Sequence, residues 1–105
     1  MRRGTTPTHK FKTKTKAGEA IDMRSAEVVY MTYKQGGQVK LEKTKDDMEI
    51  TEEEISIHLS QADTLAFSTV GDVEIECRAR FPDSEAIASC ILKIPVCKIL
   101  KEGII

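Results

Sequence analysis

The clearest pattern in the chain is an alternation of apolar and charged residues between positions 70 and 81. The apolar set is Val73, Ile75, Cys77, Ala79 and Phe81, and the charged set between them is Glu74, Glu76, Arg78 and Arg80. A period of two turns one set toward an apolar core and the other toward water. This segment is therefore predicted to be a central strand of an antiparallel sheet with one solvated face.

Shorter segments in the first half of the chain are also predicted to be strands. Residues 8–15 alternate around one apolar anchor, Phe11, with a row of lysines opposite, which is typical of an edge strand. Residues 26–34 would also fit a helix, but their β-branched and aromatic side chains favour a strand. The glycine pair in Gln35-Gly-Gly37 predicts a hairpin turn, because glycine reaches the positive φ that tight turns need.

The second half of the chain continues the pattern. Further strands are predicted at residues 39–42, 48–50, 55–59 and 85–96. The last of these is expected to pair with residues 72–81 as a hairpin, with its register left open because apolar side chains fall on both faces. Pro95 predicts a kink or an edge there. Ser60 and Asp63 have the spacing of a capping box, which predicts one helical turn after residue 60.

About seven short strands separated by turns predict an all-β fold. We expect an immunoglobulin-like β-sandwich of about seven antiparallel strands with one short helical turn. The likeness is one of architecture, because the chain has no tryptophan and no cysteine pair at immunoglobulin spacing. A chain of 105 residues is expected to hold one domain, here residues 8–105, preceded by a flexible arm at residues 1–7.

The charge balance does not favour nucleic acid or membrane as a partner. Sixteen basic and seventeen acidic residues leave a formal charge of −1. Residues 1–16 are basic, but they lack the interleaved aromatic side chains that stack on bases, so nucleic-acid binding is not expected. No apolar stretch is long enough for a membrane span, and no signal peptide is expected.

No group of residues predicts an enzyme. His58, Ser60 and Asp63 are neighbours in the sequence, but neither a nucleophile elbow nor an oxyanion hole is indicated, and Ser60 is expected to act as a helix cap. The acidic residues between positions 46 and 54 lack the ligand spacing of a calcium loop. We therefore expect no catalytic residues, no metal and no cofactor.

Three cysteines are present, Cys77, Cys90 and Cys97. Their odd number and wide spacing fit neither a disulfide framework nor a zinc site, so reduced thiols are expected. Cys77 alternates with core positions, and burial in apolar surroundings makes a thiol unreactive.

Six short motifs in order carry a resemblance to a known group of proteins. They are residues 6–11, 29–35, 41–47, 59–67, 73–79 and 86–89. Together they resemble small uncharacterised prophage proteins of Gram-positive bacteria, and the expected fold is similar to the immunoglobulin-like domain of phage upper-baseplate proteins. The resemblance spans roughly residues 6–105, with Ser60, Ala62 and Glu76 departing from the group's threonine, glutamate and glutamine. It implies a structural or accessory protein of the phage tail or baseplate region, made in the bacterial cytoplasm, with the virion as a second location.

The segment 98–105 is the candidate for a partner contact. It carries four apolar residues at a chain end, Ile99, Leu100, Ile104 and Ile105. Such residues either pack on their own domain or meet a partner. We expect a contact between chains, made with a second copy or with another phage structural protein. The alternative is a binding module that recognises a carbohydrate or a host protein.

Overall fold

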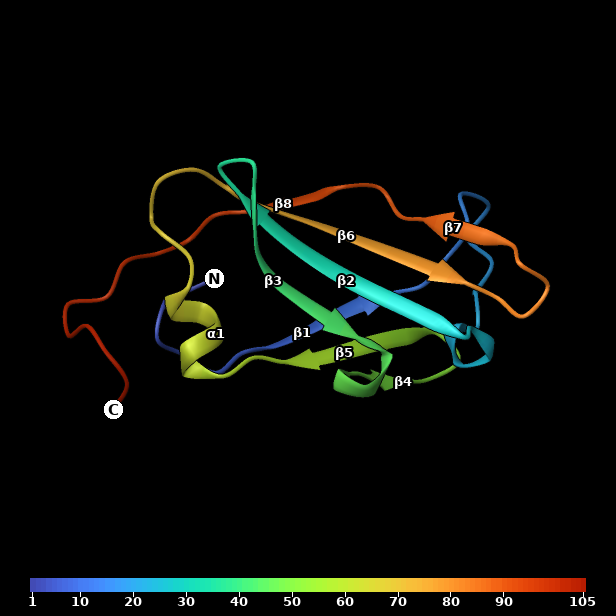
Figure 1. The fold of residues 1–105 in the computed structure, drawn as a ribbon, viewed down its shortest axis with the longest axis horizontal. Coiled ribbons are helices and arrows are strands. Elements are labelled where there is room, and N and C mark those ends of the chain that lie inside the picture. The colour runs from blue at the N-terminus through green and yellow to red at the C-terminus, as the bar shows by residue number, and fades with distance from the viewer.

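The structure, a computed structural model, describes all 105 residues and consists of two antiparallel sheets that pack against each other (Figure 1). The strands are β1 (Thr8–Lys12), β2 (Val28–Gln35), β3 (Gln38–Thr44), β4 (Glu49–Ile50), β5 (Glu54–His58), β6 (Val73–Arg80), β7 (Ala86–Ala88) and β8 (Leu92–Ile94). One short helix, α1 (Gln61–Leu65), and two single 3₁₀ turns complete the chain. The predicted all-β sandwich with one helical turn is confirmed. The molecule is elongated, 47 × 24 × 22 Å.

Strand β6 is the centre of the larger sheet, with β2 on one side and β7 and β8 on the other. Its buried side chains are Val73, Ile75 and Ala79. Arg78 and Arg80 on its other face are exposed. Glu74 shares that face and lies opposite Lys34 of β2 and Lys93 of β8, and opposite charges across a ladder are favourable. The alternation in the sequence therefore predicted this strand's place and orientation correctly.

The order of the strands is that of an immunoglobulin domain whose first strand is missing. The larger sheet runs β3-β2-β6-β7, with β8 also on β6, and the smaller sheet runs β1-β5-β4. In immunoglobulin terms these orders are C′-C-F-G and B-E-D. The first strand of an immunoglobulin domain, A, would lie at the free edge of β1. No strand occupies that edge, so β1 is an edge strand, as its lysine row predicted.

Residues 86–94 form two strands, where one continuous strand was predicted. Arg78 of β6 faces Ala88 of β7, whereas Ile75 faces Leu92 of β8. The register on the two sides of the break differs by one residue, which is the signature of a β-bulge. At the break, the hydroxyl of Ser89 accepts a hydrogen bond from the Cys77 amide at 2.9 Å, in place of a backbone carbonyl.

The bulge also explains why apolar residues of this stretch fall on both faces. Before the bulge the inward position is Ile87, which faces buried Ala79. After the bulge the inward positions are Leu92 and Ile94, which face buried Ile75 and Val73. One inserted residue therefore switches the inward face from odd to even positions.

The arm at residues 1–7 is attached to the domain, whereas we expected it to be loose. Arg2 forms a parallel bridge with Cys97, and the Arg3 amide donates to the Cys97 carbonyl at 3.2 Å. The Arg3 side chain donates to the carbonyls of Phe67 and Leu65. These bonds were not predictable from the sequence because they join segments that lie more than sixty positions apart.

The first strand is also shorter than predicted, ending at Lys12 and not at Thr15. The Thr13 amide donates to the Glu53 carbonyl, and the Thr13 carbonyl accepts from the Ile21 amide at 2.8 Å. The chain therefore leaves the sheet edge and folds into a loop over residues 13–21.

Helix α1 and the loop after it link the two sheets. Ser60 caps the helix by accepting from the Asp63 amide, and Asp63 accepts from the Ser60 amide, which is the predicted capping box. The side chain of Gln35 is buried and bonds Ser68 through both its amide nitrogen and its oxygen, at 2.8 Å each. This fixes the loop to the end of β2 and places Phe67, 1 % exposed, in the core.

Candidate interaction surfaces

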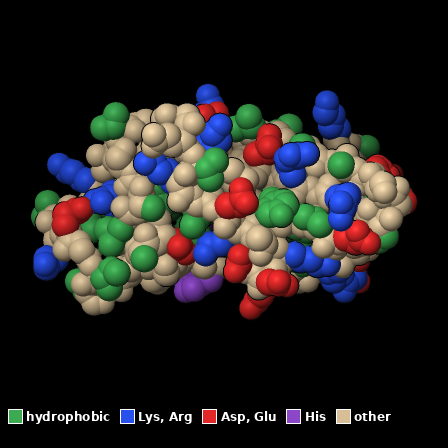
Figure 2. Space-filling view, viewed as in Figure 1, with side chains coloured by type: hydrophobic (Ala, Val, Ile, Leu, Met, Phe, Trp, Pro, Cys, Tyr) green, Lys and Arg blue, Asp and Glu red, His purple; other side chains and the backbone are tan.

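The segment 98–105 lies on the surface at one end of the molecule. Leu100 is 96 % exposed, Ile105 88 % and Ile104 68 %, whereas Ile99 is half-buried. Figure 2 shows apolar side chains exposed at the end of the molecule where Figure 1 places this segment, with acidic and basic side chains interspersed elsewhere on the visible face. Three of the four residues predicted to contact a partner are thus open to solvent, and the contact itself stays a prediction.

Few interactions hold this segment to its own domain. The Gln61 side chain exchanges two hydrogen bonds with the Ile105 backbone, at 2.8 and 3.1 Å. Arg3 forms an ion pair with Glu102, whose side chain is 57 % exposed. The Ile99 side chain packs against Gly4 and is the apolar contact that holds the segment to the domain. Exposed hydrogen bonds and ion pairs contribute little stability, so the segment beyond Ile99 is weakly attached.

A groove of about 500 Å³ opens between the two sheets, beside the free edge of β1. Its apolar lining comes from strands of both sheets and from the segments next to them: Phe11, Ile21, Met23, Met31, Ile55, Ile75, Cys77, Ile87, Ala88, Cys90 and Leu92. Leu92, at 50 % exposure, lies at its mouth. The volume is in the range of binding clefts, roughly 300–1,000 Å³.

One lip of the groove is basic. Lys12, Lys14 and Lys16 line it, and all three side chains are exposed. The arrangement would suit a ligand that has apolar groups for the floor and a negative charge for the lip.

The groove has unpaired strand edges on both sides. β1 pairs only with β5, and β7 and β8 pair only with β6. The arm at residues 1–3 covers the second edge only beside residues 95–97. The rest of the space is the position where a further strand would continue an immunoglobulin-like sandwich. An extended segment entering it would meet backbone donors and acceptors as well as apolar side chains.

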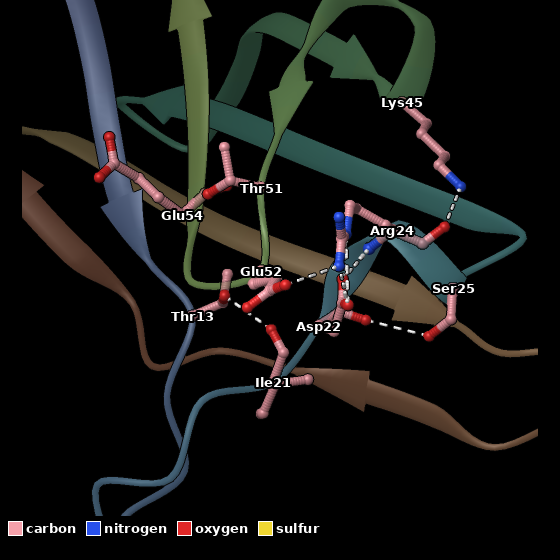
Figure 3. Close-up of polar contacts among 9 residues, drawn as sticks. All are labelled: Thr13, Ile21, Asp22, Arg24, Ser25, Lys45, Thr51, Glu52 and Glu54. Carbon is pink, nitrogen blue, oxygen red and sulfur yellow. Dashed lines mark hydrogen bonds and ion pairs between the residues drawn. The ribbon is translucent and has the colours of Figure 1, made fainter.

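The loop that forms part of this groove is held in place by polar contacts (Figure 3). The Thr13 hydroxyl donates to the Ile21 carbonyl at 2.8 Å. Next to it, Arg24 binds the Asp22 carboxylate at 2.7 Å and lies 3.5 Å from Glu52 of the smaller sheet's hairpin. The pKa of Asp22 is lowered by its hydrogen bonds from Arg24. These contacts tie the two ends of the loop together and link the turn before β2 to the β4–β5 hairpin.

The three neighbouring residues that suggested a triad are not brought together as one. The His58 ring bonds the Thr8 hydroxyl through Nδ1 at 3.0 Å. Ser60 and Asp63 bond each other's backbone as helix caps, and Asp63 also accepts from Lys43 at 3.1 Å. Two opposing effects act on the pKa of Asp63: partial burial raises it, and the hydrogen bonds from Ser60 and Lys43 lower it. The hydrogen bonds have the larger combined effect, so the pKa lies below its usual value and the carboxylate is charged.

A second histidine, His9, is bonded inside the sandwich. Its Nδ1 lies 2.9 Å from the hydroxyl of Tyr33, a fully buried residue whose ring stacks on the imidazole at 5.8 Å between centroids. Burial lowers the pKa of His9 and raises the pKa of Tyr33. Both groups are therefore neutral at pH 7, and together they join β1 to β2 across the core.

The cysteines are all free thiols, as expected. Cys77 is partly buried against the core, and this burial raises the pKa of its thiol, with the nearby Glu76 adding to the shift. Cys90 and Cys97 are exposed. No group of three or more histidine, cysteine or acidic side chains is placed to hold a metal ion.

Comparisons with protein-family models, curated proteins and solved structures found no match. None of the helices has both the length and the apolar character that crossing a membrane requires.

The groove is the feature that sequence reasoning missed. Phe11, Ile55, Ile75 and Cys77 were expected to face the core, and no opening between the sheets was predicted. The signal for an opening was indirect: the segment before Thr8 has no alternating apolar pattern that would make a further strand beside β1.

Proposed function

We propose that the protein is a non-enzymatic structural or accessory protein of a phage or prophage, associated with the tail or baseplate and acting through protein–protein assembly. The phage assignment is supported by the motif resemblance given above. The assembly role is supported by one observation: Leu100, Ile104 and Ile105 are largely exposed on a weakly attached segment. Apolar groups gathered in this way mark an interaction site.

The alternative function, recognition of a carbohydrate, has less support from the surface. Sugar binding relies on exposed aromatic rings as stacking platforms. Among the large apolar side chains that are exposed, Tyr30 is the one aromatic, at 42 % exposure. A single tyrosine on the solvated face of the larger sheet does not form such a platform.

The test compares the native chain with a triple variant, Leu100→Ser, Ile104→Ser and Ile105→Ser. Light scattering on a sizing column reports assembly, and thermal melting reports folding. We expect the native protein to form larger species as its concentration rises, and the variant to remain a folded monomer. The matched control, Val39→Ser with Val70→Ser, removes exposed aliphatic groups elsewhere, at 55 % and 82 % exposure, and should assemble like the native chain. Unfolding of the triple variant would show that the segment belongs to its own core.

A further inference from the structure

We propose that the groove beside β1 receives residues 98–105 of a second copy of this chain, as a strand added between the sheets. This inference rests on the assembly function proposed above and names the surface that the exposed segment binds. The first support is topological, because the groove occupies a place where an immunoglobulin-like sandwich has room for another strand and where the edges of β1 and β7–β8 are unpaired.

The chemistry of the segment matches that of the groove. In an extended segment, alternate residues point the same way, so Leu100, Glu102 and Ile104 share one side. The two aliphatic side chains would meet the apolar floor. Glu102 lies between them on the same side, so its side chain has to bend away from the floor to pair with the lysine lip formed by the exposed side chains of Lys12, Lys14 and Lys16.

The occupant comes from another molecule because the segment cannot readily reach its own groove. It lies at the end of the molecule next to α1, away from β7 and the loop that follows β1 (Figure 1). To fold back along β8 it would have to displace residues 1–3, which are bonded to residues 95–97. To leave its own domain the segment has to give up the Ile99 contact with Gly4, the exposed hydrogen bonds of Gln61 and the ion pair between Arg3 and Glu102.

The resulting contact joins two different surfaces. A contact of this kind repeats from copy to copy and produces a ring if it closes, or a filament if it does not. A symmetric dimer, in which two segments contact each other, would use the same surface twice and would leave both grooves empty.

The experiment uses two full-length variants, each with one surface altered. Leu92→Asp places a charge at the groove mouth on a half-exposed side chain. Leu100→Ser with Ile104→Ser removes the aliphatic pair of the segment. We expect each variant alone to be monomeric, and an equimolar mixture to form a one-to-one dimer, because the intact segment of the first variant fits the intact groove of the second. Analytical ultracentrifugation measures all three samples.

Two further variants serve as a control and as a replacement for Leu92→Asp. Val39→Asp places the same charge on a side chain of similar exposure, 55 %, away from the groove, and should assemble like the native chain. If Leu92→Asp fails to melt as a folded protein, Lys12→Glu with Lys14→Glu replaces it. This change to exposed side chains should weaken association by about fivefold or more, on the scale of a lost ion pair and a new repulsion.

The outcomes separate the two proposals. If the segment variant loses assembly while the groove variants assemble normally, the segment binds another surface and this inference is wrong, although the assembly function stands. If the mixture gives no dimer, the contact is not segment to groove. If the native chain never assembles, or if the segment variant assembles like the native chain, the proposed function fails together with the inference.

Discussion

Replacing Gly4 with alanine is predicted to weaken the attachment of residues 98–105 to their own domain. Gly4 has φ of 73°, in the left-handed region that favours glycine. A methyl group added there would lie 2.8 Å from Cδ1 of Ile99 and 3.6 Å from Cδ2 of Leu65. The first distance is too short for two carbon atoms, so the Ile99 side chain must move away from its contact.

The expected loss has two parts. A left-handed conformation costs a residue with a Cβ about 1–2 kcal/mol relative to glycine. Ile99 is half-buried, so its displacement removes part of the roughly 1.5–3 kcal/mol that full burial of such a side chain contributes, or about 1 kcal/mol. Together these lower the free energy of unfolding by about 2–3 kcal/mol.

Gly18→Ala is the matched control. Gly18 has φ of 86°, and no atom lies within 4 Å of the position where its Cβ would be. Its replacement therefore has the cost of the left-handed conformation but displaces no side chain. Urea unfolding of both variants measures the difference, expected at about 1 kcal/mol, equivalent to a melting shift of roughly 4–8 °C in a domain of this size. Equal losses of unfolding free energy in the two variants would refute the reasoning, because displacing Ile99 from Gly4 would then have no effect on stability.

Three more predictions concern the core, pH dependence and thiol reactivity. Ile55→Ala should lower the free energy of unfolding by about 2–5 kcal/mol in urea melts, since Ile55 is fully buried; a loss below 1 kcal/mol would mean that the groove already exposes it. Because burial lowers the pKa of His9, the unfolded chain binds this proton more readily. Stability should therefore begin to fall as the pH drops below about 6.5, until the folded-state pKa is passed, and His9→Gln should remove that part of a thermal-melting profile while His58→Gln keeps it. A thiol reagent should modify Cys97 quickly and Cys77 slowly in the native protein, as mass spectrometry would show; equal rates would contradict the partial burial of Cys77.

The sequence predicted the parts of the fold that depend on local patterns. The alternation along β6 and the capping box at Ser60 both appear where they were expected, because period and capping are determined by neighbouring residues. The hairpin at Gly36 and Gly37, both at positive φ, follows from the same kind of local chemistry.

The features that were not predicted depend on contacts between distant residues. The bulge at Ser89 is defined by the register of β7 and β8 against β6. Since the sequence does not show which residues pair, one continuous strand was expected there. The attachment of residues 1–3 beside Cys97 joins segments that lie far apart in the sequence. The groove follows from the missing partner of β1, which is a property of strand order and not of any one segment.

Sedimentation velocity of the native full-length chain across a wide concentration range tests the proposed assembly function most directly. The account predicts a monomer at low concentration and progressively larger species at high concentration, and it predicts that Leu100→Ser, Ile104→Ser and Ile105→Ser together abolish the larger species. A single monomeric species at every concentration, identical in the native chain and in the triple variant, would contradict it.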